Sequence, residues 1–330
     1  MMAAPNKGHT PAPAITVPPG GGADADRKAI AKGSRTARRS KGKVGPAEVT
    51  GAFTCALRDA VLRLERHEAV VRADRDPEGV HQQRVAARRL RTQLKVFAPL
   101  VDARWAARLR RELAWLDGHL AAVRDVDVVA ERLRHQPNPA TAVVLTAISE
   151  RRRAVVADLV AVLDSSRYRR LRRSLDKAAT APRWRGGAPA SRRAASDRLS
   201  RVVARRWKRL ERSVRRWEKT EDDAALHRVR IDARRGRYVC DATASVLDPA
   251  VAGMARRLAD LQDVLGEAHD ALVTAAWAED VGAGAEASVG EGIQAIAAAE
   301  RAAAMAALRH WPAAWRRAAA VAAAKPWKRG

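Results

Sequence analysis

Two segments of the chain place a histidine ahead of arginines that recur every three or four residues. The first reads VHQQRVAARRLR (residues 80–91) and the second reads LHRVRIDARRGRY (residues 226–238). On a helix, residues at these spacings lie on one face, about one turn (near 5 Å) apart. We call these faces the first ladder and the second ladder. The predicted binding residues are His81, Arg84, Arg88, Arg91 and Lys95 in the first ladder and His227, Arg230, Arg234 and Arg237 in the second, which Tyr238 flanks.

A row of guanidinium groups could bind a chain of repeating anionic groups. Each guanidinium stays charged and can donate two parallel hydrogen bonds to a pair of oxygens. A basic helix face is more often simply solvated, but two observations favour binding. No Asp or Glu stands four residues before or after Arg84, Arg88 or Arg91, and the same histidine-led row occurs twice. We therefore interpret the ladders as a binding site for a polyanion.

The bulk charge points to the same class of partner. The chain has 330 residues and a formal net charge of +26, from 63 Lys and Arg against 37 Asp and Glu. Such an excess repels itself unless an anionic partner neutralises it. Nucleic acid, an acidic membrane surface and inorganic polyanions all remain open at this point.

The sequence also bears on the location of the protein. Cys55 and Cys240 lie far apart and have no metal-ligand or redox spacing, which favours a reduced, cytoplasmic setting. The N-terminal residues lack the apolar core of a signal peptide. The alanine-rich residues 293–324 are interrupted by charged residues and Pro312, so they predict no membrane span. We expect a soluble protein.

Ala, Leu, Arg and Glu dominate from Ala47 onward and strand-like alternation is absent, which predicts a helical protein. Residues 1–47 are rich in Pro, Gly, Ala, Lys and Arg, and they predict a disordered basic tail. The predicted helices lie at about 48–73, 78–98, 102–121, 123–134, 140–163, 167–178, 191–217, 222–246, 249–267, 268–281, 286–308 and 311–323. A Pro- and Gly-containing linker at residues 180–189 separates a first bundle (48–179) from a second (190–323).

The two halves resemble copies of one unit. His81 and Arg84 match His227 and Arg230 at an offset of 146 residues. Downstream, Leu113, Leu116, Leu120 and Asp125 match Leu258, Leu261, Leu265 and Asp270 at an offset of 145 residues. A duplicated unit with a changed loop would give such a slip. The sequence thus predicts an all-α fold of two four-helix bundles, related by a pseudo-two-fold axis.

Other basic residues flank the ladders or form a stripe on the helix predicted at 191–217. The residues named as a secondary basic surface are Arg89, Arg124, Arg201, Arg205, Lys208, Arg235 and His269. Asp125 and Asp270 stand at matched places, and we interpret them as orienting nearby cations or capping a helix. Most of the tryptophans fit a core, whereas Trp327, close to the C-terminal end, is expected to be exposed.

No catalytic arrangement can be assembled from the sequence. The pair His269-Asp270 could suggest a metal phosphohydrolase, but the further spaced His and Asp ligands of such a site are missing. No E-x-E signature, phosphate-binding glycine loop or Ser/His/Asp arrangement is present. We expect a protein that is not an enzyme and that uses neither a cofactor nor a metal.

Four strings resemble the CHAD domain family, which is named for its histidine and its α-helical fold. They are VHQQRVAARRLRTQLKVF (80–97), LAWLDGHLAAVRDVDVV (113–129), LHRVRIDARRGRYVCDA (226–242) and LADLQDVLGEAHDALV (258–273). The resemblance covers about residues 48–320. It implies a pair of four-helix bundles and binding of inorganic polyphosphate in a basic groove or pore between them. The family's basic residues carry over onto His81, Arg84, Arg88, Arg91, His227, Arg230, Arg234 and Arg237.

An alternative reading is a nucleic-acid or storage-granule-associated basic protein that acts through its tail. Lys and Arg attract any polyanion, so charge alone does not separate the two readings. Tyr238 is the only Phe, Trp or Tyr within the two ladder segments. Single-stranded nucleic acid is usually held on several stacking aromatic side chains, which makes polyphosphate the better candidate. Under that reading, the protein could be associated with polyphosphate or other storage granules in the cytoplasm.

Overall fold

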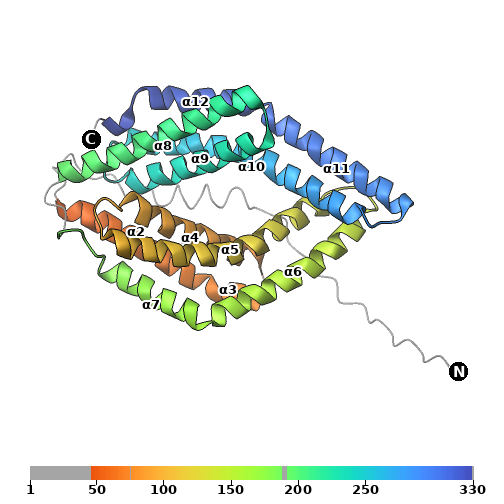
Figure 1. The fold of residues 1–330 in the computed structure, drawn as a ribbon, viewed down its shortest axis with the longest axis horizontal. Coiled ribbons are helices and arrows are strands. Elements are labelled where there is room, and N and C mark those ends of the chain that lie inside the picture. Colours follow the sequence, from red (N-terminus) through yellow and green to blue (C-terminus); the bar gives the residue numbers. More distant parts are fainter. Residues whose placement is uncertain (1–45, 75, 188–191, 329–330) are drawn as a thin grey trace. The chain divides into compact units, whose positions relative to one another are not determined.

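The computed structural model describes residues 46–328 except residue 75 and residues 188–191, with elements labelled as in Figure 1. The helices are α2 (Pro46–Arg66), α3 (Glu68–Ala73), α4 (Pro77–Val96), α5 (Ala103–Arg134), α6 (Thr141–Asp164), α7 (Ser166–Thr180), α8 (Arg192–Thr220), α9 (Asp223–Thr243), α10 (Ala250–Gly282), α11 (Ala287–Leu308), α12 (Trp311–Ala323) and a final 3₁₀ turn, η1 (Pro326–Lys328). Among the described residues there is no β-strand, so the fold is all-α as predicted. Residues 1–45 of the predicted tail (1–47) lie outside the described residues.

The first half is built around α4 and α5. Helix α4 packs against both α2 and α5, and α7 packs against α2 and α5 on the other side (Figure 1). Phe53, Leu90, Leu94 and Leu113 are fully buried in this core. Each such side chain contributes about 1.5–3 kcal/mol of hydrophobic stabilisation. This packing leaves the opposite side of α4 for its polar face.

The second half repeats this arrangement of contacts. Helix α9 packs against α8 and α10, and α12 packs against α10. Tryptophans join α8 to α12: Trp207 stacks on Trp315 with 5.3 Å between ring centroids, and Trp217 meets Trp311 edge-on at 4.9 Å. The pseudo-two-fold axis between the halves remains a prediction.

The two ladder helices begin in the same way. The Asp76 carboxylate accepts a hydrogen bond from the Glu78 backbone N–H ahead of α4, and the Asp222 carboxylate accepts one from the Ala225 backbone N–H ahead of α9. An aspartate at this position satisfies backbone donors that the first helical turn leaves unpaired. In each helix the ladder histidine follows the capping aspartate by five residues.

Two helices are longer than the sequence predicts. The predicted pairs 102–121 with 123–134 and 249–267 with 268–281 are each one continuous helix, α5 and α10. The predicted breaks were wrong because no proline interrupts either segment. Gly118 and Gly266 point to open space, where a glycine costs only about 1 kcal/mol relative to alanine. Asp125 and Asp270 therefore lie inside helices and cap neither of them.

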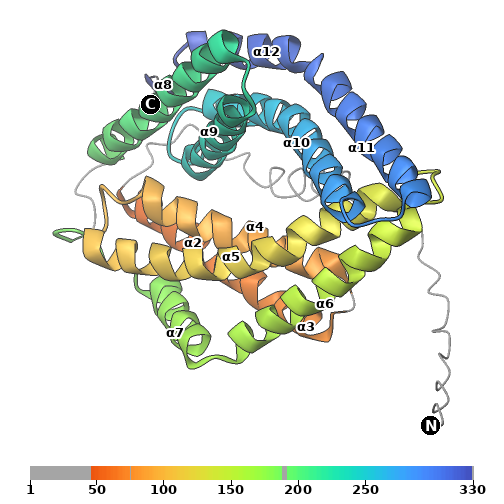
Figure 2. The same ribbon diagram turned by 45° about the vertical axis from the view of Figure 1, so that its right-hand side comes forward.

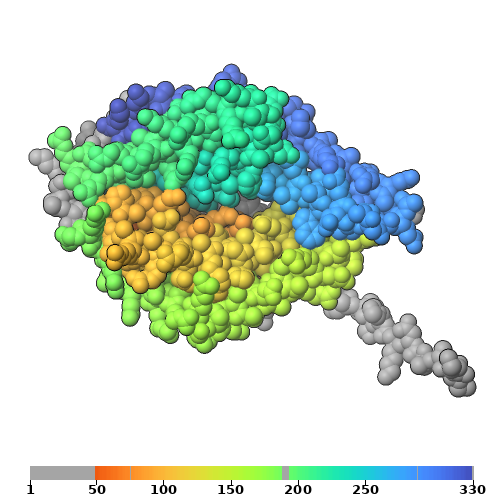
Figure 3. Space-filling view, in the orientation of Figure 1, coloured from red at the N-terminus to blue at the C-terminus, as the bar shows by residue number. Residues whose placement is uncertain are grey.

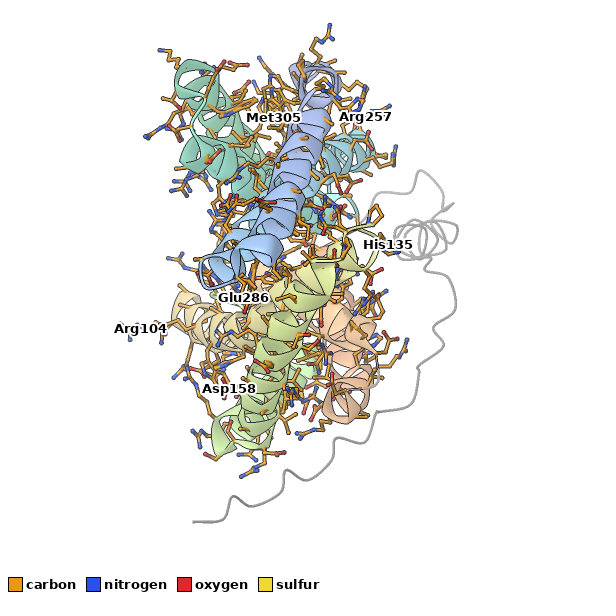
Figure 4. The ribbon with its side chains drawn as sticks, turned by 90° about the vertical axis from the view of Figure 1, so that its right-hand side faces the viewer. Arg104, His135, Asp158, Arg257, Glu286 and Met305 are labelled. Carbon is orange, nitrogen blue, oxygen red and sulfur yellow. The ribbon has the colours of Figure 1, made fainter. Side chains whose placement is uncertain are left out.

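The two halves meet at several places within one compact unit, Val44–Gly330. Helix α4 contacts α9, α5 contacts α10, and α6 contacts α11. Figure 2 shows that α10 and α11 contact α5 and α6 at one end of this unit. The carboxyl ends of the ladder helices α4 and α9 lie at the opposite end. There Arg132 of α5 pairs with Glu267 of α10 and Glu300 of α11, both at 2.7 Å. In Figure 4, α11 and α6 meet close to Glu286, at the start of α11.

The C-terminal end corrects one expectation from the sequence. Trp327 was expected to be exposed, but only 6% of its surface is accessible. The turn η1 folds back and contacts α8 and α10, so the indole is covered by these helices. The described part of the linker is also packed: the Asp102 N–H donates to the Arg183 carbonyl, and Trp184 meets Phe53 edge-on.

Candidate anion-binding site

The two ladders face each other across the contact between α4 and α9. Burial first, and then the positive charges of Arg88 and Arg230, lower the pKa of the Arg234 guanidinium from its ordinary value. Burial and the Arg88 charge likewise lower the pKa of Arg230, although Asp270 partly offsets this. Guanidiniums from the two helices are thus close enough to repel each other. Figure 3 shows the seam between α4 (orange) and α9 (teal), which is hollowed near its middle.

A carboxylate from α5 holds the first ladder in place. Asp117 lies 3.9 Å from the Nε of Arg84 and 3.5 Å from the Nε of Arg88, and it also pairs with Arg91. Asp117 is itself buried. The sequence prediction missed this residue, although an aspartate between Leu113, Leu116 and Leu120 was a visible signal. No carboxylate of α4 lies four residues from Arg84, Arg88 or Arg91, but the carboxylate of Asp117 on the next helix, α5, pairs with all three arginines.

A second ion pair recurs in the two halves. Asp125 lies 3.4 Å from Nη1 of Arg84, and Asp270 lies 3.6 Å from Nη2 of Arg230. The reading of these aspartates as orienting nearby cations is confirmed, and the capping alternative is wrong. Burial and then the charge of Arg88 lower the pKa of the Arg84 guanidinium, and Arg124, beside Asp125, adds a smaller contribution in the same direction.

The positive charge of the second ladder is neutralised by fewer nearby carboxylates than that of the first. Arg237 pairs with Asp241 at 3.7 Å on its own helix. Among the described residues, no carboxylate lies within ion-pair distance of Arg234. In the second half, the residue that matches Asp117 at the offset of 145 residues is Gln262, whose side chain is neutral. Tyr238 lies close enough to Arg230 and Arg234 to influence the pKa of both.

Two histidines lie together at the start of the second ladder. The rings of His227 and His269 are 5.3 Å apart between centroids. Burial, Arg230 and His227 lower the pKa of His269 to about 4, and burial followed by Arg230 and Arg234 lowers the pKa of His227. Both line a cavity of about 350 Å³ with Arg230. His81 lies half-buried in the first turns of α4.

The far end of the first ladder opens into a further group of cations. Burial and then Arg206, Arg235, Arg110 and Arg209 lower the pKa of Lys95 to about 8. Arg235 also lies 3.8 Å from Asp232, a buried residue of the same helix. The sequence prediction named Lys95 and Arg235 but missed Arg110 of α5 and Arg206 and Arg209 of α8. Arg206 and Arg209 lie beside the named stripe on α8, and only the packing of the helices brings them and Arg110 close to Lys95.

The secondary basic residues divide into three groups. Arg124 and His269 lie at the ladders, and Arg235 lies beside Lys95. Arg205 and Lys208 line a cavity with Lys95, and Arg201 lines the next cavity along α8. Arg89 is half-buried on α4.

Within the described part of the chain, no three His, Cys, Asp or Glu side chains are grouped as metal ligands. Cys240 is buried and Cys55 is exposed, and both are free thiols. None of the described helices is both long enough and apolar enough to cross a membrane.

Comparisons with known proteins agree with this architecture. No curated protein matches the chain. The fold is similar to that of PptA from Streptomyces chartreusis, with a TM-score of 0.62 and 20% identity, covering 81% of this chain and 98% of that one. It is also similar to the CHAD domain from the plant Ricinus communis, with a TM-score of 0.59 and 25% identity, covering 84% and 91%. The family model for the CHAD domain matches residues 55–279, about two thirds of the sequence, and the chain belongs to the CHAD domain family.

Proposed function

We propose that this protein binds inorganic polyphosphate through the two ladders and does not cleave it. The observation that carries the proposal is the convergence of Arg84 and Arg88 from α4 with arginines from α9. Like charges brought together in a folded protein destabilise it, unless a ligand of opposite charge compensates them. Membership of the CHAD family supports this proposal, because binding of polyphosphate is the activity that the family resemblance implies.

The chemistry of the site fits a chain of phosphates. Successive ladder arginines are about 5 Å apart along each helix, so they meet a ligand whose anionic groups repeat. Each guanidinium can donate two hydrogen bonds to one phosphate, and Arg keeps its charge where Lys would lose it. A single carboxylate or sulfate would engage only one or two of these groups.

A nucleic acid is the competing ligand. It offers the same phosphates, and the basic residues of the tail could add to its binding. The ladder segments offer one aromatic side chain, Tyr238, for stacking against bases. We therefore place polyphosphate first and propose that DNA binds less tightly to the ladders.

The test is a competition experiment at fixed salt concentration. Long-chain polyphosphate labelled at one end is bound to the protein, and single-stranded DNA, double-stranded DNA and unlabelled polyphosphate are titrated in. We expect polyphosphate to displace the label at much lower phosphate concentration than either DNA. Equal displacement by DNA would reduce the site to a general polyanion surface.

The proposal that the protein does not cleave polyphosphate needs a separate test. We expect no release of phosphate when the protein is incubated with polyphosphate, with or without Mg²⁺. We also propose that the protein accumulates where polyphosphate is stored, such as cytoplasmic granules. Imaging of a fluorescent fusion beside a polyphosphate stain would show whether the two coincide.

A further inference from the structure

A pocket of about 550 Å³ lies between α5 and α7, and we call it the α5–α7 pocket. Helix α5 lines it with Trp105, Arg108, Leu109 and Glu112, which lie on one helix face because they stand at positions i, i+3, i+4 and i+7. Sites for small organic ligands have volumes of about 300–1,000 Å³, so this pocket has the size of a ligand site.

The α5–α7 pocket is separate from the two ladders. Asp117, which pairs with the first-ladder arginines, stands nine residues after Arg108 on α5. At about 100° per residue, these two side chains leave opposite sides of the helix. Figures 1 and 2 both show α7 on the side of α5 that faces away from α9. No residue that lines the pocket belongs to either ladder.

The floor of the α5–α7 pocket is apolar. Leu109 and Leu171 are buried, and Trp105 is buried beside them with 8% of its surface accessible. An apolar or aromatic part of a ligand would cover this floor and remove it from water, which is favourable. A chain of phosphates offers the floor only charge, so inorganic polyphosphate is a poor match for it.

The rim of the pocket is basic. Glu112 is the one acidic residue that lines it, and its Oε2 is already 2.7 Å from the Nε of Arg167. Arg108, Lys177 and Arg183 also line the pocket and are exposed. Within the part of the chain that the structure describes, no carboxylate lies within ion-pair distance of these three. The rim therefore offers three uncompensated cations to an anionic ligand.

Ser174 adds a hydrogen-bond acceptor between the floor and the rim. Its Oγ donates its hydrogen to the Arg170 carbonyl at 2.8 Å, which leaves the lone pairs of the oxygen for a ligand. Inorganic polyphosphate that is fully ionised has no hydrogen to donate to these lone pairs. The hydroxyl groups of a sugar and the amino group of a base do.

We propose that the α5–α7 pocket binds a nucleotide. The base covers the apolar floor at Trp105, a sugar hydroxyl or base amino group donates to Ser174, and the phosphates meet Arg108, Lys177 and Arg183. This site takes a different class of ligand from the ladders and lies on a different surface. The inference therefore goes beyond the proposed function and does not depend on it.

The experiment uses ATP as the probe, with tripolyphosphate and adenosine as its two halves. Each is titrated by calorimetry into the full chain, first alone and then after saturation with long-chain polyphosphate. The pocket variant carries Arg108→Gln, Lys177→Gln and Arg183→Gln, and its control carries Arg151→Gln, Arg153→Gln and Arg317→Gln, which remove three exposed charges elsewhere. Ser174→Ala is a second variant, and thermal unfolding verifies that each protein folds.

We expect the wild-type protein to bind ATP more tightly than either half, and to bind it still after saturation with polyphosphate. The pocket variant should lose about tenfold in affinity for ATP, as three exposed charge pairs would predict, whereas the control should stay within about twofold of wild type. Ser174→Ala should weaken binding of ATP a few-fold and leave that of tripolyphosphate unchanged.

Four results would overturn the inference. They are no binding of ATP by the wild-type protein, equal affinities for ATP and tripolyphosphate, loss of ATP binding once polyphosphate is bound, and equal losses in the pocket variant and its control. None of them bears on whether the ladders bind polyphosphate. Conversely, a protein that binds ATP but no long-chain polyphosphate would refute the proposed function and leave this site standing.

Discussion

At the scale of single residues, Asp117 determines how the first ladder presents its charge. Its buried carboxylate is shared by Arg84, Arg88 and Arg91, so these guanidiniums are held in place and partly neutralised. The matched residue of the second half, Gln262, is neutral. Its Oε1 is buried and accepts no hydrogen bond. The second ladder therefore keeps more free positive charge.

This difference predicts opposite effects of two substitutions. Asp117→Asn should raise affinity for polyphosphate about tenfold, because the arginines lose a competing anion. It should also lower the free energy of unfolding by about 3 kcal/mol, because buried positive charge is left unpaired. Gln262→Glu should lower affinity by a similar factor, since it places a carboxylate at the position of the second half that matches Asp117.

Calorimetric titration and chemical denaturation measure both quantities. Unchanged affinity in both variants would show that the local carboxylate balance does not control binding.

The histidines at the second ladder predict a dependence on pH. The lowered pKa values mean that His227 and His269 are neutral at pH 7 in the free protein. A bound polyanion favours the protonated form, so binding at pH 6 should take up protons and be tighter than at pH 8. Calorimetry in buffers of different ionisation enthalpy reports the uptake. His227→Gln with His269→Gln should take up fewer protons, and equal uptake would assign these histidines a structural role.

The same shifts affect stability. A histidine whose folded pKa is lowered contributes stability at pH values above its unfolded pKa, near 6.5. That contribution is lost as the pH falls from about 6.5 towards 4, the value for His269. The wild-type protein should therefore lose more stability over this range than the double Gln variant, as thermal unfolding at several pH values would show.

At the scale of helices, the proposed function requires α4 and α9 to act as a pair. Arg84→Ala with Arg88→Ala should weaken polyphosphate binding, and so should Arg230→Ala with Arg234→Ala. Each lost charge-assisted contact costs about 1.5–3 kcal/mol. The second pair should cost more, because Asp117 already offsets part of the charge of the first. Arg151→Ala with Arg153→Ala on α6 is the control.

Equilibrium titration ranks these three double variants. If both ladder variants retained wild-type affinity, the ladders would be solvated faces and the attraction would be diffuse. If only one of them lost affinity, the ligand would lie along a single helix.

At the scale of the whole molecule, the halves are joined by charge as well as by packing. Glu300 is 2% exposed and accepts hydrogen bonds from Arg132 and Gln136 of the first half. Glu279 and Arg301 form a comparable pair inside the second half, but Arg301 is 53% exposed. Buried pairs are costly to break, whereas exposed ones contribute little.

Glu300→Gln should therefore lower the free energy of unfolding by about 3 kcal/mol, because Arg132 is left buried with less compensation. Glu279→Gln removes the same charge and should cost less than about 1 kcal/mol. Urea denaturation measures both. Similar values for the two variants would mean that the Arg132–Glu300 pair does not stabilise the contact between the halves.

The sequence alone was sufficient for the features that depend on local spacing. A helix places residues three and four apart on one face, so both ladders and the all-α fold could be predicted from the order of residues. The offset of 145 residues also identified Asp125 and Asp270 as matched, and both pair with ladder arginines.

Only the tertiary structure decided which faces meet. Asp117 serves arginines 26 to 33 residues away, Arg206 and Arg209 lie by Lys95 through the packing of α8 on α9, and Trp327 is covered by a turn that folds back. These contacts depend on how helices cross, which spacing along one helix does not specify. The ladders are thus a property of the sequence, whereas their charge balance and the group of cations around Lys95 are properties of the fold.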